Sequence, residues 1–151
     1  MVRLLFLDFD GVLHPNHCAV DAYFSRMPLL ESLLQSAGSD LGVVISSSWR
    51  HHHTYEELLA FLPGSVSQQV VGATGSAVIG KHARYQEIRS YLSDYRGCSD
   101  WRALDDSAWE FPDPCVELVR CDGAVGLTNR EVERIPSAIQ LQMGSGYHLV
   151  A

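Results

Sequence analysis

The hydrophobic positions of the chain fall into short runs, and these runs predict buried strands. Leu4 to Leu7 is an apolar run that is too short for a helix of its own. Leu41 to Ile45 is a second such run, and Trp101 to Leu104 is a third. Uninterrupted apolar runs are typical of central parallel strands that are covered on both faces. Weaker strand signals are present at Val70-Val71 and at residues 118–121.

Between these runs, apolar residues recur at helical spacing. Pro28 suits the first turn of a helix that extends to Ala37, and the segment after Lys81 shows a similar stripe. Thr54 with Glu57 has the spacing of a capping box that starts a helix. A second capping box begins at residue 128, and its helix is expected to be interrupted at residue 136.

This alternation of strands and helices predicts an α/β protein. We expect a mostly parallel sheet of about five strands with helices on both faces, in a single domain over residues 1–151. Apolar residues make up 46% of the chain and charged residues 19%, which is typical of a globular protein. No apolar run approaches the roughly 20 residues that span a bilayer, and the amino terminus lacks a signal-peptide pattern, so we expect a cytoplasmic location.

Two acids follow the first strand and point to metal chemistry. Asp8 and Asp10 bracket Phe9, so in extended geometry both carboxylates leave the same face of the strand end. Gly11 then allows a sharp turn, and the carboxyl ends of strands are where open α/β sheets bind ligands. Carboxylates crowded together repel, and a divalent cation would relieve that repulsion. The alternative is an ordinary Asp-Gly turn after a strand.

The stretch Leu-Asp-Phe-Asp-Gly-Val-Leu-His, residues 7–14, resembles motif I of the haloacid dehalogenase (HAD) superfamily of phosphohydrolases. This resemblance implies a three-layer, Rossmann-like HAD fold. It also implies that Asp8 attacks phosphorus as the nucleophile, and that Asp10 serves as general acid and base. Mg²⁺ is the cofactor that the resemblance implies.

Two later strand ends are similar to further motifs of the superfamily. Ser46 is the first hydroxyl after the second apolar run, as in motif II, where it would bind the transferring phosphoryl group; Ser47 is the alternative. Asp105 and Asp106 follow the third run and resemble motif IV, which completes the metal site. Asp106 is the preferred direct ligand, with Asp105 as an outer or additional one. Hard oxygen ligands favour Mg²⁺ over zinc.

Motif III of the superfamily supplies one cation that neutralises the nucleophile and the phosphate. Two residues of this chain are candidates for it. Lys81 lies 25 residues before Asp106 (106 − 81), an interval that resembles the family's, and Arg84 lies one helical turn later. We favour Lys81 and keep Arg84 as the alternative. Arg50 follows the serine turn and would contact a second substrate phosphate or form a salt bridge. The run His51 to His53 does not predict a metal site, because consecutive residues do not converge on one ion.

The spacing between motifs leaves little room for a cap domain, so we expect an open site. An open site suits a phosphorylated small molecule enclosed by a second copy in a homo-oligomer, or the terminal phosphate of a polymer. The chain is most similar to the small capless HAD domains associated with RNA-repair proteins, over roughly residues 2–135. That similarity implies a nucleic-acid end as substrate. The net charge of −7 argues against an extended nucleic-acid footprint but allows local phosphate binding.

Two other classes of protein remain as alternatives. Receiver domains are also α/β proteins with clustered aspartates and Mg²⁺, but their phospho-acceptor follows a later strand. Here the strand from Leu41 to Ile45 ends in serines instead. A catalytically silent phosphate-binding module would keep the fold and the metal site without turnover.

Overall fold

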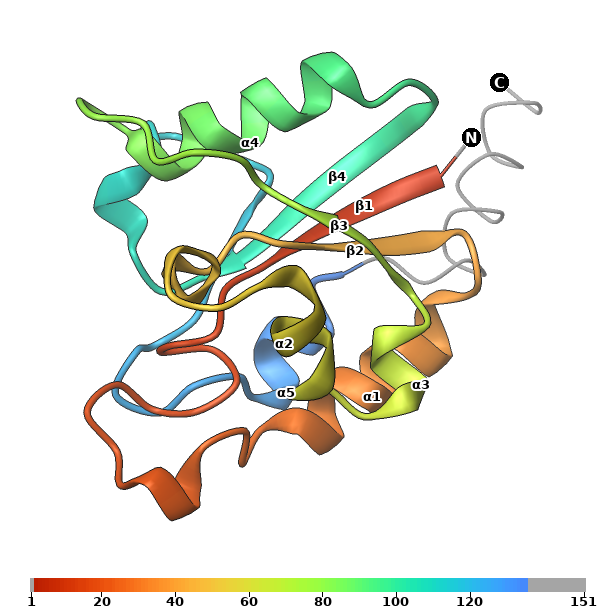
Figure 1. Ribbon diagram of the computed structural model, residues 1–151, viewed down its shortest axis with the longest axis vertical. Helices are drawn as coiled ribbons and strands as arrows, with labels where there is room; N and C mark the ends of the chain where they lie inside the picture. Colours follow the sequence, from red (N-terminus) through yellow and green to blue (C-terminus); the bar gives the residue numbers. More distant parts are fainter. Residues whose placement is uncertain (1, 136–151) are drawn as a thin grey trace.

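The structure is a computed structural model, and it describes residues 2–135. Its centre is a sheet of five strands in the order β3-β2-β1-β4-β5, in which every neighbouring pair is parallel (Figure 1). The strands are β1 (Val2–Leu7), β2 (Leu41–Ile45), β3 (Val70–Ala73), β4 (Cys98–Asp105) and β5 (Leu118–Arg120). The expected α/β fold with a parallel sheet is therefore confirmed.

Helices connect the strands and cover both faces of the sheet. The α-helices are α1 (Met27–Ala37), α2 (Tyr55–Ala60), α3 (Gly64–Ser67), α4 (Ala83–Asp94) and α5 (Asn129–Val132). Within residues 2–135, three short 3₁₀ helices, η1 (Val20–Ala22), η2 (Ser48–His51) and η3 (Ala108–Glu110), lie in the connections. In Figure 1, α4 lies on one side of the sheet, and α1, α2, α3 and α5 lie on the opposite side. These two helical layers and the sheet make up the three layers.

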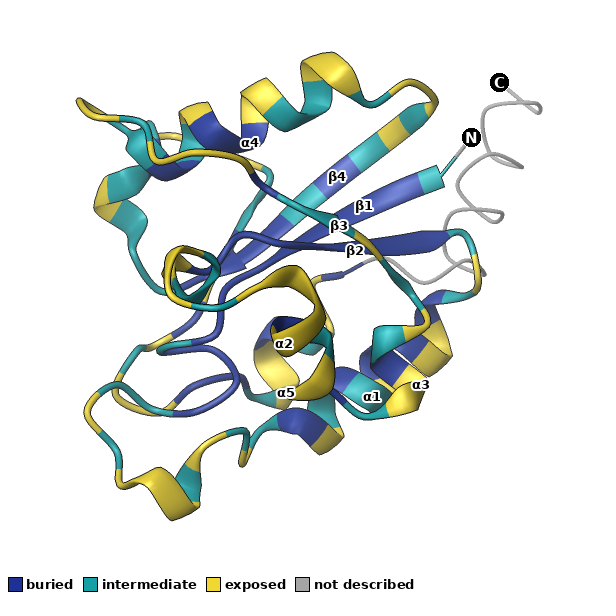
Figure 2. Cartoon of the chain, viewed as in Figure 1, coloured by how far each residue is buried: buried dark blue, intermediate teal, exposed yellow. Residues whose placement is uncertain are grey.

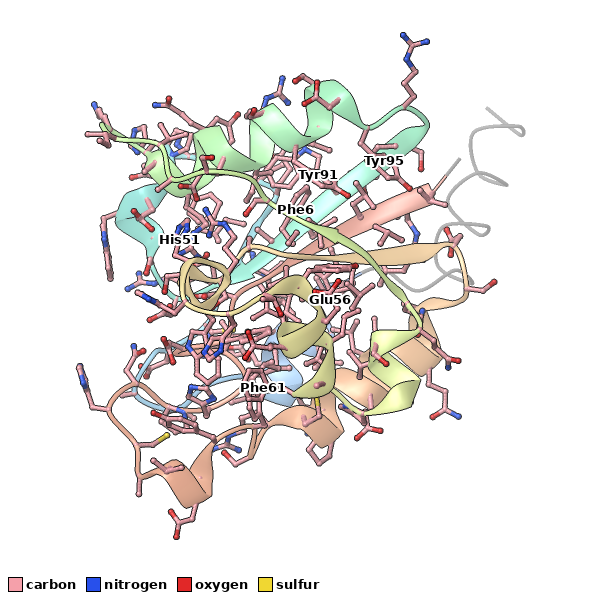
Figure 3. The ribbon with its side chains drawn as sticks, in the orientation of Figure 1. Phe6, His51, Glu56, Phe61, Tyr91 and Tyr95 are labelled. Carbon is pink, nitrogen blue, oxygen red and sulfur yellow. The ribbon has the colours of Figure 1, made fainter. Side chains whose placement is uncertain are left out.

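The apolar run of β1 supplies both halves of the core. Leu5 and Leu7 pack with the cluster that contains α1, whereas Leu4 and Phe6 pack with the cluster that contains Ile88 of α4. Successive side chains of a strand point to opposite faces, which is why an uninterrupted apolar run suits a covered strand. Figure 2 shows β1 and β2 as almost continuously buried, and Figure 3 shows Phe6 on the side of α4.

The element boundaries differ from the sequence expectation at three places. Strand β4 begins at Cys98 and includes Asp105, so it is longer than the apolar run that predicted it. Helix α4 begins at Ala83 rather than at Lys81, because His82 before it has a left-handed backbone (φ 55°). Helix α3 was not expected. The predicted interruption at Pro136 lies outside the described residues.

The strand order creates a switch point beside β1. The chain moves from β1 to β2 and β3 on one side, and then crosses to β4 and β5 on the other. Open α/β sheets bind ligands at the carboxyl ends of the strands beside such a reversal. Within residues 2–135 no segment forms a cap domain over this edge, as the spacing predicted. No helix in the same range combines the length and apolar character that crossing a bilayer requires.

Candidate active site

The turn after β1 places Asp8 at the switch point. The Asp8 side chain is almost fully buried, and its Oδ1 accepts a hydrogen bond of 2.8 Å from the backbone N–H of Phe9. Gly11 has φ +77°, a conformation that strongly favours glycine. A Cβ at this position would lie 2.4 Å from Cγ of Asp106. A glycine is therefore required both for the turn and for the close approach of the β4 end to the β1 end.

Three carboxylates from two strand ends meet at this point. Asp8, Asp105 and Asp106 each offer a ligand atom, and these atoms lie within 4.8 Å of one another. Asp105 is fully buried, and its Oδ1 accepts a hydrogen bond from the backbone N–H of Ser107. Asp106 is partly buried, and its Oδ2 accepts a hydrogen bond of 2.8 Å from Asn16. The sequence predicted that these three acids would lie together, and they form the candidate metal site.

The electrostatics of the group favour a bound cation. Burial raises the pKa of Asp8 well above its ordinary value, and the negative charge of Asp105 raises it further. Burial also raises the pKa of Asp105. The guanidinium of Arg84 opposes both shifts but does not cancel them. Because Asp8 and Asp105 share one positive partner, a divalent cation would stabilise the ionised forms of the three grouped acids.

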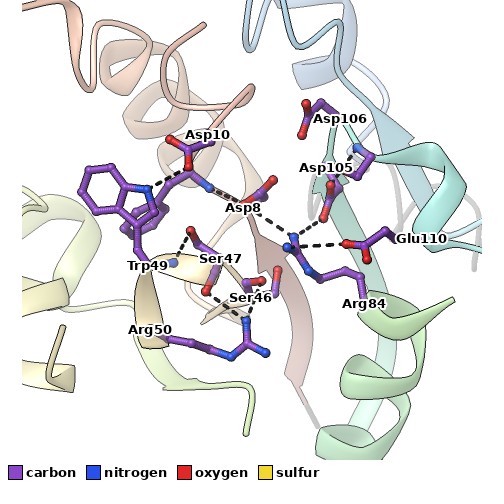
Figure 4. Close-up of polar contacts among 12 residues, drawn as sticks. Asp8, Asp10, Ser46, Ser47, Trp49, Arg50, Arg84, Asp105, Asp106 and Glu110 are labelled. Atoms are coloured by element: carbon purple, nitrogen blue, oxygen red, sulfur yellow. Dashed lines mark hydrogen bonds and ion pairs between the residues drawn. The ribbon is translucent and has the colours of Figure 1, made fainter. Parts of the chain in front are cut away.

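That positive partner is Arg84, which α4 directs toward the strand ends (Figure 4). Its Nη1 lies 2.6 Å from Oδ2 of Asp105 and 3.5 Å from Oδ1 of Asp8, and its Nη2 lies 3.7 Å from Glu110. The side chain of Arg84 is only 10% exposed. Lys81, the candidate that the spacing favoured, is exposed and precedes the helix. The geometry therefore brings Arg84, and not Lys81, into contact with the carboxylates.

Asp10 lies apart from the three grouped acids. Its Oδ1 is 2.8 Å from Nε2 of His14, and its Oδ2 accepts a hydrogen bond of 3.0 Å from the Trp49 indole. The backbone N–H of Phe24 donates to Nδ1 of His14, so Nε2 carries the proton and donates to Asp10. Within residues 2–135, the carboxylate of Asp10 is not part of the group that could hold a metal. The expected metal-ligand role of Asp10 therefore has no support from its side-chain position.

The two serine candidates have different surroundings. The backbone N–H of Ser46 donates to the carbonyl of Leu7, which places Ser46 beside the end of β1. The Ser46 hydroxyl is buried, and among the described residues it has no hydrogen-bond partner. The Ser47 hydroxyl accepts a hydrogen bond from the backbone N–H of Trp49 at the start of η2. An unpartnered buried hydroxyl is costly, so Ser46 has the stronger reason to bind a ligand.

Arg50 holds the serine turn against α4. Its Nη1 donates to the carbonyl oxygens of Ser46 and Ser47, and its Nη2 lies 2.9 Å from Glu87. Both partners of this ion pair are buried, with side chains 5% and 7% exposed. Of the two alternatives that the sequence allowed for Arg50, the structure shows the salt bridge, and the guanidinium is bound by protein groups.

Several residues of this network were not identified from the sequence as site residues. They are His14, Asn16, Trp49, Glu87 and Glu110. His14 is the last residue of the stretch 7–14 quoted above, and Trp49 follows the serines soon after Ser47, so both lie close in sequence to predicted site residues. Glu87 and Glu110 belong to segments whose approach to the site depends on the folded chain. The run His51 to His53 contributes nothing to the candidate metal group within residues 2–135.

A comparison with models of protein families matches most of the chain. A family model described as "HAD domain in Swiss Army Knife RNA repair proteins" matches residues 4–132. The matched range includes every strand end that contributes to the site, from Asp8 to Asp106. Neither a curated protein nor a solved structure matches the chain.

Proposed function

The chain belongs to the family of HAD domains in Swiss Army Knife RNA repair proteins, and from this premise we propose that it is a Mg²⁺-dependent phosphomonoester hydrolase. The observation that carries the proposal is the group of Asp8, Asp105 and Asp106, together with the guanidinium of Arg84 that contacts Asp8 and Asp105. A buried nucleophile, a cation and a set of hard oxygen ligands at one strand edge suit the transfer of a phosphoryl group.

The first step forms a bond between a carboxylate oxygen of Asp8 and phosphorus, while the bond to the leaving alcohol breaks. Asp10 gives its proton to that alcohol, and His14 and Trp49 hold the Asp10 carboxylate in position. In the second step water attacks the aspartyl-phosphate, Asp10 accepts the proton, and phosphate leaves with Asp8 regenerated. Each Asp10 oxygen has a second lone pair, so these hydrogen bonds leave room for the proton.

Two groups are positioned to bind the phosphoryl oxygens. The Ser46 hydroxyl is buried beside the β1 end and has no partner among the described residues. The guanidinium of Arg84 lies 3.5 Å from Oδ1 of Asp8 and can neutralise charge on an incoming phosphate. Arg84 thus takes the motif III role in this proposal, in place of Lys81.

Asp8, Asp105 and Asp106 would hold the Mg²⁺ ion, because their oxygen atoms are close together and of the type that this ion prefers. When bound, the ion supplies positive charge to the phosphoryl oxygens and to Asp8. Asn16 orients Asp106, and Ser107 together with Arg84 orients Asp105.

The substrate that we propose is the terminal phosphate of a nucleic acid. The description of the family refers to RNA repair proteins, and the described chain has no cap domain that would enclose a small metabolite. An open edge leaves space for a strand that continues beyond its terminal phosphate.

The test is hydrolysis of an aryl phosphate and of end-phosphorylated oligonucleotides by the purified chain, with and without Mg²⁺. Asp8→Asn should reduce the rate by more than about a thousandfold, which corresponds to about 4 kcal/mol of barrier. Asp21→Asn is the matched control, because it makes the same chemical change at an exposed position of η1. Full activity in Asp8→Asn would refute the nucleophile. Mg²⁺ binding without turnover in the wild type would instead identify a silent or receiver-like module.

A further inference from the structure

A basic pocket lies beside the candidate active site, between β5 and α5. It has a volume of about 570 Å³, and Arg120, Arg130 and Arg134 are among the residues that line it. Three of the chain's eleven basic residues therefore gather in one pocket of a protein whose net charge is −7. The net charge of the whole chain is negative, but this pocket carries a local concentration of positive charge.

The three arginines are available to a ligand. All three are exposed, and none forms an ion pair with a carboxylate among residues 2–135. The two acids of the pocket are already hydrogen-bonded to the backbone. Asp122 accepts from the N–H of Ala124, and Glu131 accepts from the N–H of Thr128 in a capping box.

The pocket adjoins the metal group. Gly123 lines the pocket, and a Cβ built on it would lie 2.5 Å from Oδ2 of Asp106. On the adjacent strand, Arg120 is paired in register with Asp105, at the same carboxyl edge of the sheet. A ligand in the pocket would therefore be separated from the candidate metal site by little more than the backbone at Gly123.

We propose that this pocket binds a backbone phosphodiester of the nucleic-acid strand whose terminal phosphate lies at Asp8. The inference rests on the proposed function and specifies its substrate class. Guanidinium groups bind phosphate oxygens through paired N–H donors, and contacts to backbone phosphates position a strand without reading its sequence. Arg84 is held by Asp8 and Asp105 at the reaction centre, so the pocket arginines serve a different phosphate of the same molecule.

The variant that tests this inference is Arg130→Ala combined with Arg134→Ala. Its matched control is Arg89→Ala combined with Arg96→Ala, which removes the same charge from exposed positions on and after α4. Both variants change the formal net charge from −7 to −9 (−7 − 2). Because all four side chains are exposed, we expect both variants to fold, and circular dichroism checks this directly.

Two readouts use a ten-nucleotide single-stranded RNA that carries a terminal phosphate. In the Asp8→Asn background, fluorescence anisotropy should show RNA binding weakened at least about tenfold by the pocket variant and less than about twofold by the control. The plot of log K against log salt has a negative slope, and its magnitude should decrease by about 1.4 in the pocket variant. Each contact to a single strand contributes about 0.7, and the variant removes two. In the active background, the ratio of kcat/KM for the RNA to kcat/KM for an aryl phosphate should fall by a similar factor.

Equal losses in the pocket variant and its control would overturn the proposal, because they would indicate a general charge effect. An equal loss for a nucleoside bisphosphate and for the RNA would also overturn it, since the pocket would then bind a second phosphate of a small molecule. These results are distinct from failure of the proposed function, which would appear as absence of hydrolysis by the wild type. The anisotropy measurement does not require turnover.

Discussion

At the scale of the residue, the neighbours of each polar group limit what it can do. Asp8 is buried beside Asp105, so its pKa is raised and its ionised form needs a cation. Asp10 is bound by His14 and Trp49, which fix the direction of its oxygens outside the metal group. Residues of the same type therefore have different roles because their contacts differ, and the same argument applies to the two serines after β2.

We predict that Ser46→Ala will mainly reduce activity, whereas Ser47→Ala will mainly reduce stability. Ser46→Ala removes a hydroxyl that has no partner among the described residues, so stability should change little while kcat/KM falls by roughly 10- to 100-fold. Ser47→Ala removes the acceptor of the Trp49 N–H and should cost about 1 kcal/mol of stability. Urea unfolding and aryl phosphate kinetics of both variants test this. A larger kinetic loss in Ser47→Ala would assign the phosphate contact to Ser47.

At the scale of the element, the start of α4 decides which basic residue reaches the site. His82 has a left-handed backbone, and the helix that follows directs Arg84 toward the ends of β1 and β4. Lys81 precedes this turn and is exposed. The spacing to Asp106 could not distinguish the two residues, because the boundary of the helix differs from the expected one by two positions (83 − 81).

We predict that Arg84→Met will be far more damaging than Lys81→Met. Without Arg84, the carboxylates of Asp8 and Asp105 lose a buried partner, which should destabilise the metal-free protein by about 3–5 kcal/mol. The loss of positive charge at the phosphate should also lower kcat/KM by more than about 100-fold. Lys81→Met should change stability by less than about 0.5 kcal/mol. Chemical unfolding and phosphatase assays measure both effects, and a strong loss in Lys81→Met alone would restore Lys81 as the motif III cation.

At the scale of the whole molecule, the fold brings acids together and their repulsion is a cost in the absence of metal. The sheet order places the ends of β1, β2 and β4 side by side, and the core packs on both faces of β1. Packing of the core against β1 therefore stabilises a structure in which Asp8 and Asp105 are buried near each other, despite their repulsion. Their raised pKa values are the measurable consequence, and they link stability to pH and to Mg²⁺.

We predict that the metal-free protein loses stability through these groups as pH rises above about 4. The pKa of Asp8 and of Asp105 is higher in the folded state than in the unfolded state, where it is about 3.9, so the folded state holds more protons in this range. Raising the pH removes those protons at a cost of about 1.4 kcal/mol per unit of raised pKa. Asp8→Asn lacks one such group, so its stability relative to the wild type should increase with pH.

Urea unfolding of the wild type and Asp8→Asn between pH 4 and pH 8, with chelator and with Mg²⁺, measures this linkage. Saturating Mg²⁺ binds the ionised carboxylates and should stabilise the wild type by about 2.7 kcal/mol at a hundredfold excess over Kd. The benefit should be much smaller in Asp8→Asn. Parallel pH profiles for the two proteins in chelator would contradict the raised pKa of Asp8.

The sequence by itself determined the fold class, the family and most of the strand positions. The apolar runs from Leu4 to Leu7 and from Leu41 to Ile45 are local patterns, and a buried strand needs only such a pattern. The acids Asp8, Asp105 and Asp106 were also identified, because they follow predicted strands whose parallel ends must share one edge of the sheet. Their catalytic roles remain predictions.

The tertiary structure alone decided which partners these acids have. The contact of Arg84 with Asp8 and Asp105 and the ion pair of Arg50 with Glu87 join segments that are distant in sequence. No local pattern records such contacts, because they depend on the direction of a helix start and on how connections pack across the strand ends. Short-range periodicity determines the elements, whereas long-range packing determines which charges meet.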